Sequence, residues 1–269
     1  MNDTTPRRSA PRVIAIATAA LGAAVVVGTL TTSAVATAAV ASVSTETRTL
    51  DVAGVRELDV DADTTALRVI FSDVEEATLT VTSGTGADSW TFERDANELT
   101  VAAPDRQWGS IWPLGGELSA ILTLPRSLQG DALDASLSLD AGELSIDGRF
   151  GELEVEMGAG GLNIDGSAQS VSVQLDFGNA DIRLADTRSA QFEVSAGALS
   201  AVLTGTAPDV VGIDVSAGSA EVTLPDGMYD VRSDASAGEI ENGLSTAAGA
   251  DSVVNVAVSA GSVILTPPR

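Results

Sequence analysis

From Thr47 to the end of the chain, hydrophobic and polar residues alternate with a period of two. This alternation indicates β-strands with one buried face, because successive side chains point to opposite faces of a strand. Turn-forming Gly, Asp, Asn and Pro separate the alternating runs, and none of the runs has a helical spacing. In the first half of this region the pattern predicts these strands: Arg48–Val52, Glu57–Asp61, Ala66–Phe71, Ala77–Thr82, Ser89–Glu93, Glu98–Ala102 and Glu117–Leu124.

A repeat begins near Ala132 and carries seven glycines at spacings of 18 to 23 residues. Periods of about this length are typical of proteins built from stacked, similar units. Four of the glycines end a Ser-Ala-Gly triplet, and the others end Asp-Ala-Gly, Gly-Ala-Gly and Asp-Phe-Gly. The seven are Gly142, Gly160, Gly178, Gly197, Gly218, Gly238 and Gly261.

Every glycine of the repeat stands at the same place in the hydrophobic pattern. The positions seven, five and three before it, and two and four after it, are apolar in all copies except for Ser233 and Asn242. The inward positions on the two sides of the glycine are five residues apart, an odd number, which a straight strand cannot connect. The chain must therefore turn a corner at the small-residue triplet, where glycine allows backbone angles that other residues resist.

Stacking these units would bury all the apolar rows together, which one unit cannot do alone. We therefore predict an all-β fold in which about seven rungs of about 20 residues form a β-solenoid. It would be similar to a right-handed parallel β-helix, because crossovers between parallel strands are nearly always right-handed. A β-sandwich of ordinary hairpins is the alternative.

Both ends of such a stack need protection, because unpaired strand edges invite aggregation. We expect the strands between Thr47 and Pro125 to form a β-meander that covers the N-terminal end. Pro267 and Pro268 cannot donate ladder hydrogen bonds, so we expect the last strand of the chain to be the other edge.

The N-terminal segment has the features of a sequence that directs a protein to the cell envelope. Arg7, Arg8 and Arg12 precede an apolar stretch, Val13–Leu30, which is close to the shortest length that spans a bilayer as a helix. The basic residues place the N-terminus inside the cell and the rest of the chain outside. We expect a retained single-pass anchor, and the alternative is a signal peptide cleaved near Ala38 or Ala41, where small residues recur. The predicted organisation is a basic cytoplasmic tail at 1–12, the anchor or signal peptide at 13–41, a capping β-region at 42–125 and the repeats at 126–269.

The net charge of −24 sets limits on partners and chemistry, since an acidic surface repels nucleic acid and anionic lipid headgroups. The chain has no Cys and no His, which excludes disulfides, thiolate chemistry and a Ser-His-Asp triad. We expect no cofactor and no metal. Aromatic residues make up only 3% of the chain, which suits thin layers of small aliphatic side chains.

Two small groups of residues could form sites. Trp108 and Trp112 share the loop-like segment Asp105–Gly116 and could stack on a sugar, insert at a membrane surface or bind a protein partner, or could instead close the end of the stack. Asp59, Asp61 and Asp63 alternate in one strand and could hold calcium, although such a row is more often a solvated face. The sequence predicts no catalytic residue, because the acidic side chains elsewhere are scattered through turns and outward positions.

The membrane-type segment, a strand ending in Leu122-Thr123-Leu124-Pro125 and the repeated small-residue corners together resemble the bacterial "putative adhesin" family, a domain of unknown function made of β-strand repeats. The resemblance extends from about Leu58 to Leu265. It implies a right-handed β-helical fold and attachment at the cell surface. It supplies no catalytic or binding residues.

These observations favour a non-enzymatic, adhesin-like protein that presents a β-solenoid outside the membrane to a protein or glycan of the cell envelope. One alternative is an accessory component of an envelope-stress or cell-wall sensing system. Another is a glycan-active enzyme, because a mechanism with paired carboxylates needs neither His nor Cys. The pattern indicates no particular oligomeric state.

Overall fold

The structure is a computed structural model that describes residues 44–83, 90–104, 119–131 and 133–268. The predicted N-terminal helix lies outside these residues. The described part is all-β, as predicted, and contains no helix with the length and apolar character needed to cross a bilayer. Its strands are β1 (Ser44–Leu50), β2 (Glu57–Ser72), β3 (Ala77–Ser83), β4 (Thr91–Asp95), β5 (Glu98–Ala102), β6 (Ser119–Pro125), β7 (Asp134–Ala185), β8 (Ser189–Thr204), β9 (Val210–Thr223), β10 (Tyr229–Asn242) and β11 (Ser252–Thr266), with one 3-10 helix, η1 (Arg126–Asp131), which the pattern did not predict.

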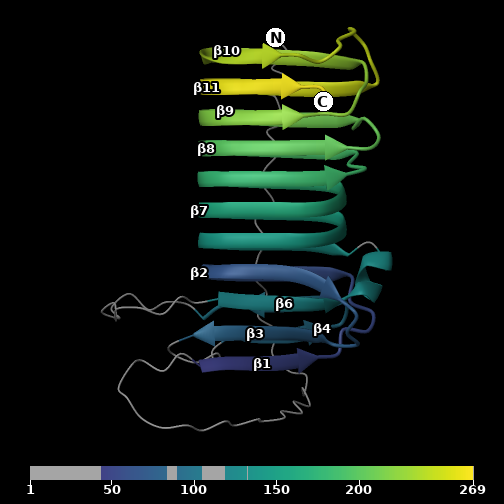
Figure 1. The fold of residues 1–269 in the computed structure, drawn as a ribbon, viewed down its shortest axis with the longest axis vertical. Helices are drawn as coiled ribbons and strands as arrows, with labels where there is room; N and C mark the ends of the chain where they lie inside the picture. The colour runs from purple at the N-terminus through teal and green to yellow at the C-terminus, as the bar shows by residue number, and fades with distance from the viewer. Residues whose placement is uncertain (1–43, 84–89, 105–118, 132, 269) are drawn as a thin grey trace, which may run out of the picture. The chain divides into compact units, whose positions relative to one another are not determined.

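Most of the sheet is a parallel ladder that runs from β2 through β7, β8, β9 and β11 to β10 (Figure 1). β7 alone is 52 residues long and contains three of the seven glycine corners. Equivalent residues of neighbouring strands are paired, so that the corner glycines themselves meet across the ladder. Gly178 pairs with Gly197, Gly197 with Gly218, and Gly218 with Gly261.

The corners have the geometry that the spacing predicted. Leu139 and Leu144, five residues apart on either side of Gly142, are both buried. Gly160 has a φ of +132°, in the region that favours glycine, and a Cβ at this position would overlap the carbonyl oxygen of Gly142 in the adjacent turn of the chain. Close backbone contact, together with the unusual φ, therefore explains why this position repeats as glycine.

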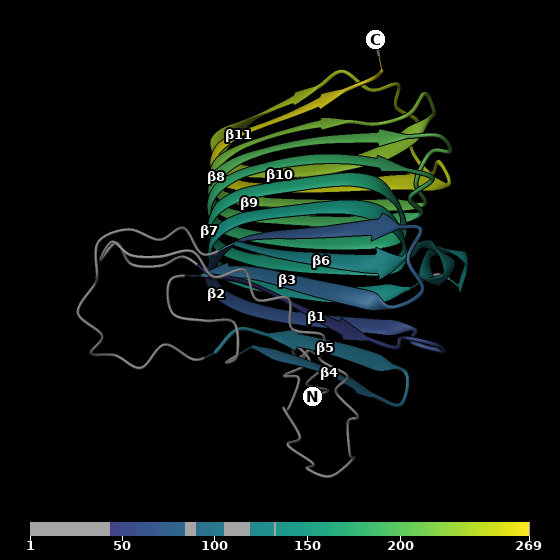
Figure 2. The same cartoon turned by 60° about the horizontal axis from the view of Figure 1, so that its bottom comes forward.

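The N-terminal strands differ from the predicted meander. Glu57–Asp61 and Ala66–Phe71 are not separate strands but parts of β2, which pairs with β7 and brings the buried Thr65 opposite Gly142. Beyond β2 the ladder divides, since β5 pairs in parallel with its first half and β6 with its second half. β4 then pairs with β5, β3 pairs with β6 and β1 pairs with β3, all in antiparallel fashion, and Figure 2 turns this end forward.

The C-terminal end also differs from the expectation. β11 is not an edge strand, because it lies between β9 and β10 and pairs in parallel with both. β10 is the last strand of the ladder. Its inward residues include Ser233 and Asn242, the two polar exceptions of the repeat, and both are exposed at this end. Polar side chains are tolerated where water reaches them, which gives a physical reason for this order.

Candidate functional site

Each long strand of the ladder presents two sets of outward side chains, one before its corner glycine and one after it. We call these the pre-corner face and the post-corner face. Because the strands are in register, equivalent outward residues lie side by side at the strand spacing of about 4.8 Å. Each face is therefore an array of rows that cross the strands.

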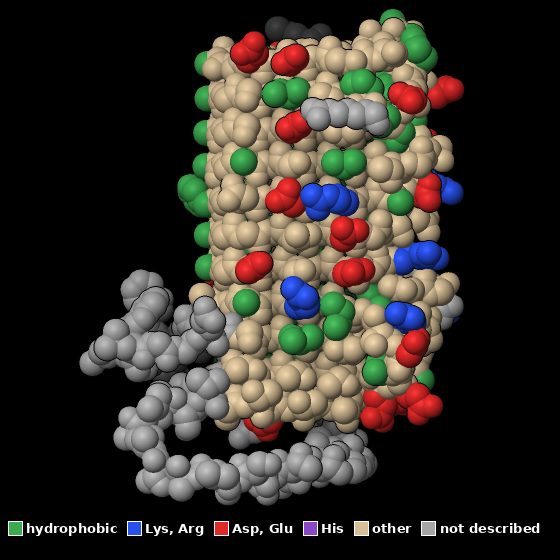
Figure 3. Space-filling view, viewed as in Figure 1, with side chains coloured by type: hydrophobic (Ala, Val, Ile, Leu, Met, Phe, Trp, Pro, Cys, Tyr) green, Lys and Arg blue, Asp and Glu red, His purple; other side chains and the backbone are tan. Residues whose placement is uncertain are grey.

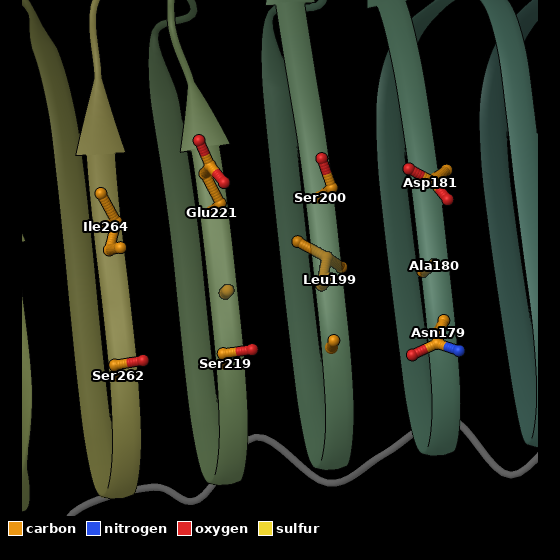
Figure 4. Close-up of a pocket in the computed structure, with 11 residues that line it drawn as sticks. Asn179, Ala180, Asp181, Leu199, Ser200, Ser219, Glu221, Ser262 and Ile264 are labelled. Atoms are coloured by element: carbon orange, nitrogen blue, oxygen red, sulfur yellow. The ribbon is translucent and has the colours of Figure 1, made fainter.

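A hollow of about 420 Å³ lies on the post-corner face, over the end of β7 and over β8, β9 and β11. Two rows of outward residues line it, and Figure 4 shows them on neighbouring strands. The row next to the corner consists of Asn179, Ala198, Ser219 and Ser262, and the following row consists of Asp181, Ser200, Glu221 and Ile264.

The lining of the hollow mixes polar and apolar side chains and contains no Lys or Arg. It offers serine hydroxyls, one amide and the two carboxylates of Asp181 and Glu221. Ser200 lies between those two residues in the register, which puts them two strand spacings, about 10 Å, apart. At that separation they cannot jointly ligate one metal ion, but both can accept hydrogen bonds from one extended ligand.

An exposed aromatic side chain lies at the corner of β7, outside the lining of the hollow. Phe177 is 62% exposed and precedes Asn179 by two residues on β7. Figure 3 shows a line of apolar side chains along one edge of the ladder. At the position of Phe177 in the other six copies of the corner the residue is alanine: Ala141, Ala159, Ala196, Ala217, Ala237 and Ala260.

The pre-corner face is strongly acidic near its N-terminal end. Glu57 pairs with Glu98 of β5 and with Asp134 of β7. Burial raises the pKa of the Asp59 carboxyl, and the nearby charges of Glu98, Asp61 and Glu57 raise it further. The outward residues of β4 and β5 continue this face, and its acidic residues near the N-terminal end include Glu57, Asp59, Asp61, Glu93, Asp95, Glu98, Asp134, Glu152, Glu154 and Glu156.

The predicted aspartate row is only partly realised. Asp59 and Asp61 lie on the pre-corner face, whereas Asp63 stands where β2 turns its corner, next to Thr64 and Thr65. Within the described ranges there is no group of three or more side chains placed to hold a metal ion.

The candidate binding residues Trp108 and Trp112 lie outside the described residues. The remaining tryptophan, Trp90, is buried at the N-terminal end of the ladder, where its carbonyl oxygen accepts a 2.6 Å hydrogen bond from the Arg48 guanidinium. The same guanidinium lies 5.9 Å from the centroid of the Phe92 ring. Arg48 of β1 thus links the β1–β3 pair of strands to the β4–β5 pair, a contact that no pattern in the sequence indicated.

A second depression, of about 730 Å³, lies beside η1. The charged residues of its lining are the acidic Asp147 and Asp186 and the basic Arg149. Gln129 and Gln169 also line it. This mixed lining favours no single class of ligand, and the hollow on the post-corner face is the better-defined candidate.

No known protein family and no curated protein matches the chain. Several solved structures are similar to it. A putative cell adhesion protein from Clostridium sporogenes is 12% identical, with 84% of this chain and 100% of that chain covered and a TM-score of 0.41. A putative adhesin from Bacteroides fragilis is 13% identical, with 83% and 97% covered and a TM-score of 0.47. A putative lipid binding protein from Parabacteroides distasonis is 13% identical, with 84% and 97% covered and a TM-score of 0.41.

By its fold, the described part of the chain is an all-β protein built on a parallel ladder. Three of the similar solved structures are named putative adhesins, which is the name of the family that the sequence resembles.

Proposed function

We propose that this chain is a non-enzymatic, adhesin-like protein of the cell surface, whose ladder is a β-solenoid held outside the membrane by the segment Val13–Leu30. The alternative placement is a secreted protein, released by cleavage near Ala38 or Ala41. Its partner would be a protein or a glycan of the cell envelope.

The observation that carries this proposal is the in-register pairing of the long strands. Because equivalent positions repeat along the ladder, each outer face presents rows of side chains at regular intervals. A partner that is itself extended can contact several rows at once, and many weak contacts then add up to firm attachment. The scaffold supplies spacing and rigidity, while the outward side chains supply recognition.

The acidic pre-corner face supports a role at a surface rather than on a lipid bilayer. Its carboxylates repel anionic headgroups and would hold the ladder away from the membrane that carries it. Such repulsion favours an orientation in which the ladder projects outward, where a partner can reach the post-corner face.

Attachment can be tested with cells that produce the full chain, cells that lack it and cells that produce it without residues 133–268. We expect the cells with the full chain to retain a surface property, such as adhesion to a solid support or to other cells, that both other strains lose. Equal adhesion, envelope integrity and partner capture in all three strains would refute the proposal.

Placement and partner can be tested in the same strains. We expect protease added to intact cells to digest the ladder, and the membrane fraction to retain the chain with its basic N-terminus. A mature protein in the medium that starts near Ser42 would favour secretion. Crosslinking in cells that captures a neighbouring membrane protein would favour the sensing role instead, and polysaccharide hydrolysis by the purified chain would favour an enzyme.

A further inference from the structure

We propose that the hollow on the post-corner face binds a neutral saccharide chain that lies across β7, β8, β9 and β11. This inference rests on the proposed surface-binding function and names the ligand class and the site. Four features carry it: the charge of the hollow, its hydrogen-bonding groups, its length and the exposed aromatic ring at the corner of β7.

The charge of the lining selects against acidic ligands. Asp181 and Glu221 are the charged residues among those that line the hollow, and both are anionic. Phosphate, sulfate or a carboxylated sugar would meet these carboxylates without any lining cation to compensate. Arg183, exposed two residues beyond Asp181 on the same strand, offsets part of the negative potential.

The hydrogen-bonding groups suit a ligand rich in hydroxyls. Carboxylates accept hydrogen bonds only, while serine hydroxyls and the Asn179 amide both donate and accept. A sugar hydroxyl likewise donates and accepts, so neighbouring hydroxyls of one ring can satisfy both kinds of group. Specific sites of this sort combine a few convergent polar groups with apolar contact area, which Ala198 and Ile264 provide here.

The hollow is long enough for more than one sugar unit. Asp181 pairs with Ser200, Ser200 with Glu221, and Glu221 with Ile264, so one row crosses four strands. At the usual strand spacing this row is about 14 Å long and offers a contact about every 4.8 Å. A chain of sugar rings has a comparable repeat, and successive rings can therefore contact side chains of successive strands.

Phe177 supplies the apolar surface that a sugar ring needs. The C–H groups on one side of a pyranose ring are apolar, and the face of an aromatic ring, with its negative quadrupole, is a favourable partner for them. Phe177 is exposed at the corner beside Asn179, where the other six copies of the corner carry alanine. Phe177 stands two residues before Asn179, the first lining residue on its strand, so its ring can contact a sugar that extends from the hollow past the corner.

The test uses the full chain in mild detergent on an array of neutral hexose and N-acetylhexosamine oligosaccharides, together with their sulfated and sialylated counterparts. We expect saturable binding to neutral oligosaccharides, longer chains bound more tightly than single sugars, and no gain from sulfate or sialic acid. Two variants probe the site: Ser200→Leu fills the centre of the hollow, and Phe177→Ala removes the ring. We expect Ser200→Leu to weaken binding at least about tenfold and Phe177→Ala by about three- to tenfold.

Gln174→Leu is the matched control, because it adds the same side chain to an outward position of β7 on the pre-corner face. It should bind like the unaltered chain, and all three variants should keep its melting temperature. Preference for acidic glycans, absence of neutral saccharide binding, or full binding by Ser200→Leu would overturn the inference. If cells still lose adhesion without residues 133–268 but adhere normally with Ser200→Leu, the proposed function stands and the saccharide site fails.

Discussion

β10 and β11 carry the same Ser-Ala-Gly corner and pair with each other in register, yet they occupy very different places. β11 is hydrogen-bonded on both sides, to β9 and to β10, whereas β10 forms the end of the ladder. The inward residues of β11 are buried without exception, and those of β10 are half-buried or exposed. In β11 they are Val254, Val256, Val258, Val263 and Leu265, and in β10 they are Val231, Ser233, Ala235, Ile240 and Asn242.

This difference explains why the ladder departs from chain order at this point. If β10 followed β9 directly, Ser233 and Asn242 would enter the apolar interior, where a polar group without a partner costs roughly 1–3 kcal/mol. With β11 between them, those two side chains face the open end. The segment between β10 and β11 covers part of that end, because the Leu244 side chain is buried there. The corner motif thus defines a rung, and its inward residues decide where in the ladder the rung lies.

The strongest test of this comparison introduces the same charge at equivalent inward positions of the two strands. Val256 of β11 and Ser233 of β10 are paired in register. Val256→Asp buries a carboxylate between β9 and β10 and should lower the free energy of unfolding by about 4 kcal/mol or more. Ser233→Asp adds a solvated charge and should change it by less than about 0.5 kcal/mol. Urea unfolding followed by circular dichroism measures both, and equal losses would show that the two positions are equally buried.

The corner glycines offer the second test. Gly261 of β11 has a φ of +128°, and a Cβ there would overlap the carbonyl oxygen of Gly218. Gly261→Ala should therefore cost about 3 kcal/mol, the sum of backbone strain and displaced strands.

Gly238→Ala in β10 is the matched control for that substitution. No positive φ is required at Gly238, and the nearest obstacle to its Cβ is the Val258 side chain. We expect about half the loss, measured by the same unfolding experiment. A larger effect at Gly238 than at Gly261 would contradict the view that the stacked backbone of the interior demands glycine.

Alternation and the spacing of the glycines predicted the strands and corners well, because both follow from local parity along the chain. They could not predict the order of the strands, since every rung offers the same hydrogen-bonding edge to any other. The signal for the order, Ser233 and Asn242, was visible but carries meaning only once the rungs are compared in space. The glycine spacing did not predict the corner of β2, because Thr65 occupies the position that is glycine in the repeats.

The alternation of hydrophobic and polar residues likewise could not predict the hollow, because the hollow depends on which outward side chains become neighbours across strands. Asp181 and Glu221 are 40 positions apart in the chain, and only the register places Ser200 between them. Once the glycines are aligned, the positions one and three after them do give the two lining rows. The candidate site thus follows from the register, whereas the fold class follows from the alternation alone.

Tyr229, the first residue of β10, anchors the end strand and provides a smaller test. Its side chain is buried, and its hydroxyl donates a 2.6 Å hydrogen bond to the carbonyl oxygen of Pro225. Tyr229→Phe should lower the free energy of unfolding by about 1 kcal/mol, the usual net value of such a bond. β11, which is held on both sides, should keep its amide protection in hydrogen exchange, while β10 loses some.

The same residue makes the end of the ladder sensitive to alkali. Burial, and to a smaller extent the charge of Asp226, raises the pKa of the Tyr229 hydroxyl above its value in the unfolded chain. The stabilisation from the neutral hydroxyl is therefore complete below about pH 10 and is lost as the pH rises through the raised value. Tyr229→Phe should remove this part of the alkaline loss, and an identical pH dependence in both proteins would contradict the assignment.

The smallest expected change in stability comes from making β10 resemble β11. Ser233→Val combined with Asn242→Leu places apolar side chains at exposed inward positions of the end strand. These side chains gain little burial there, and the 3.0 Å hydrogen bond that the Asn242 Oδ1 accepts from the Leu244 N–H is lost, so the free energy of unfolding should fall by no more than about 1 kcal/mol. The end of the ladder, however, loses two polar groups that discourage a second chain from pairing with β10. We therefore expect the double variant to self-associate end to end as its concentration rises, which sedimentation velocity can measure.

Asp251→Asn, an exposed polar change in the loop before β11, should leave the chain's association state unaltered. If the double variant remains as dispersed as the parent, the two polar residues determine strand order alone and do not protect the edge.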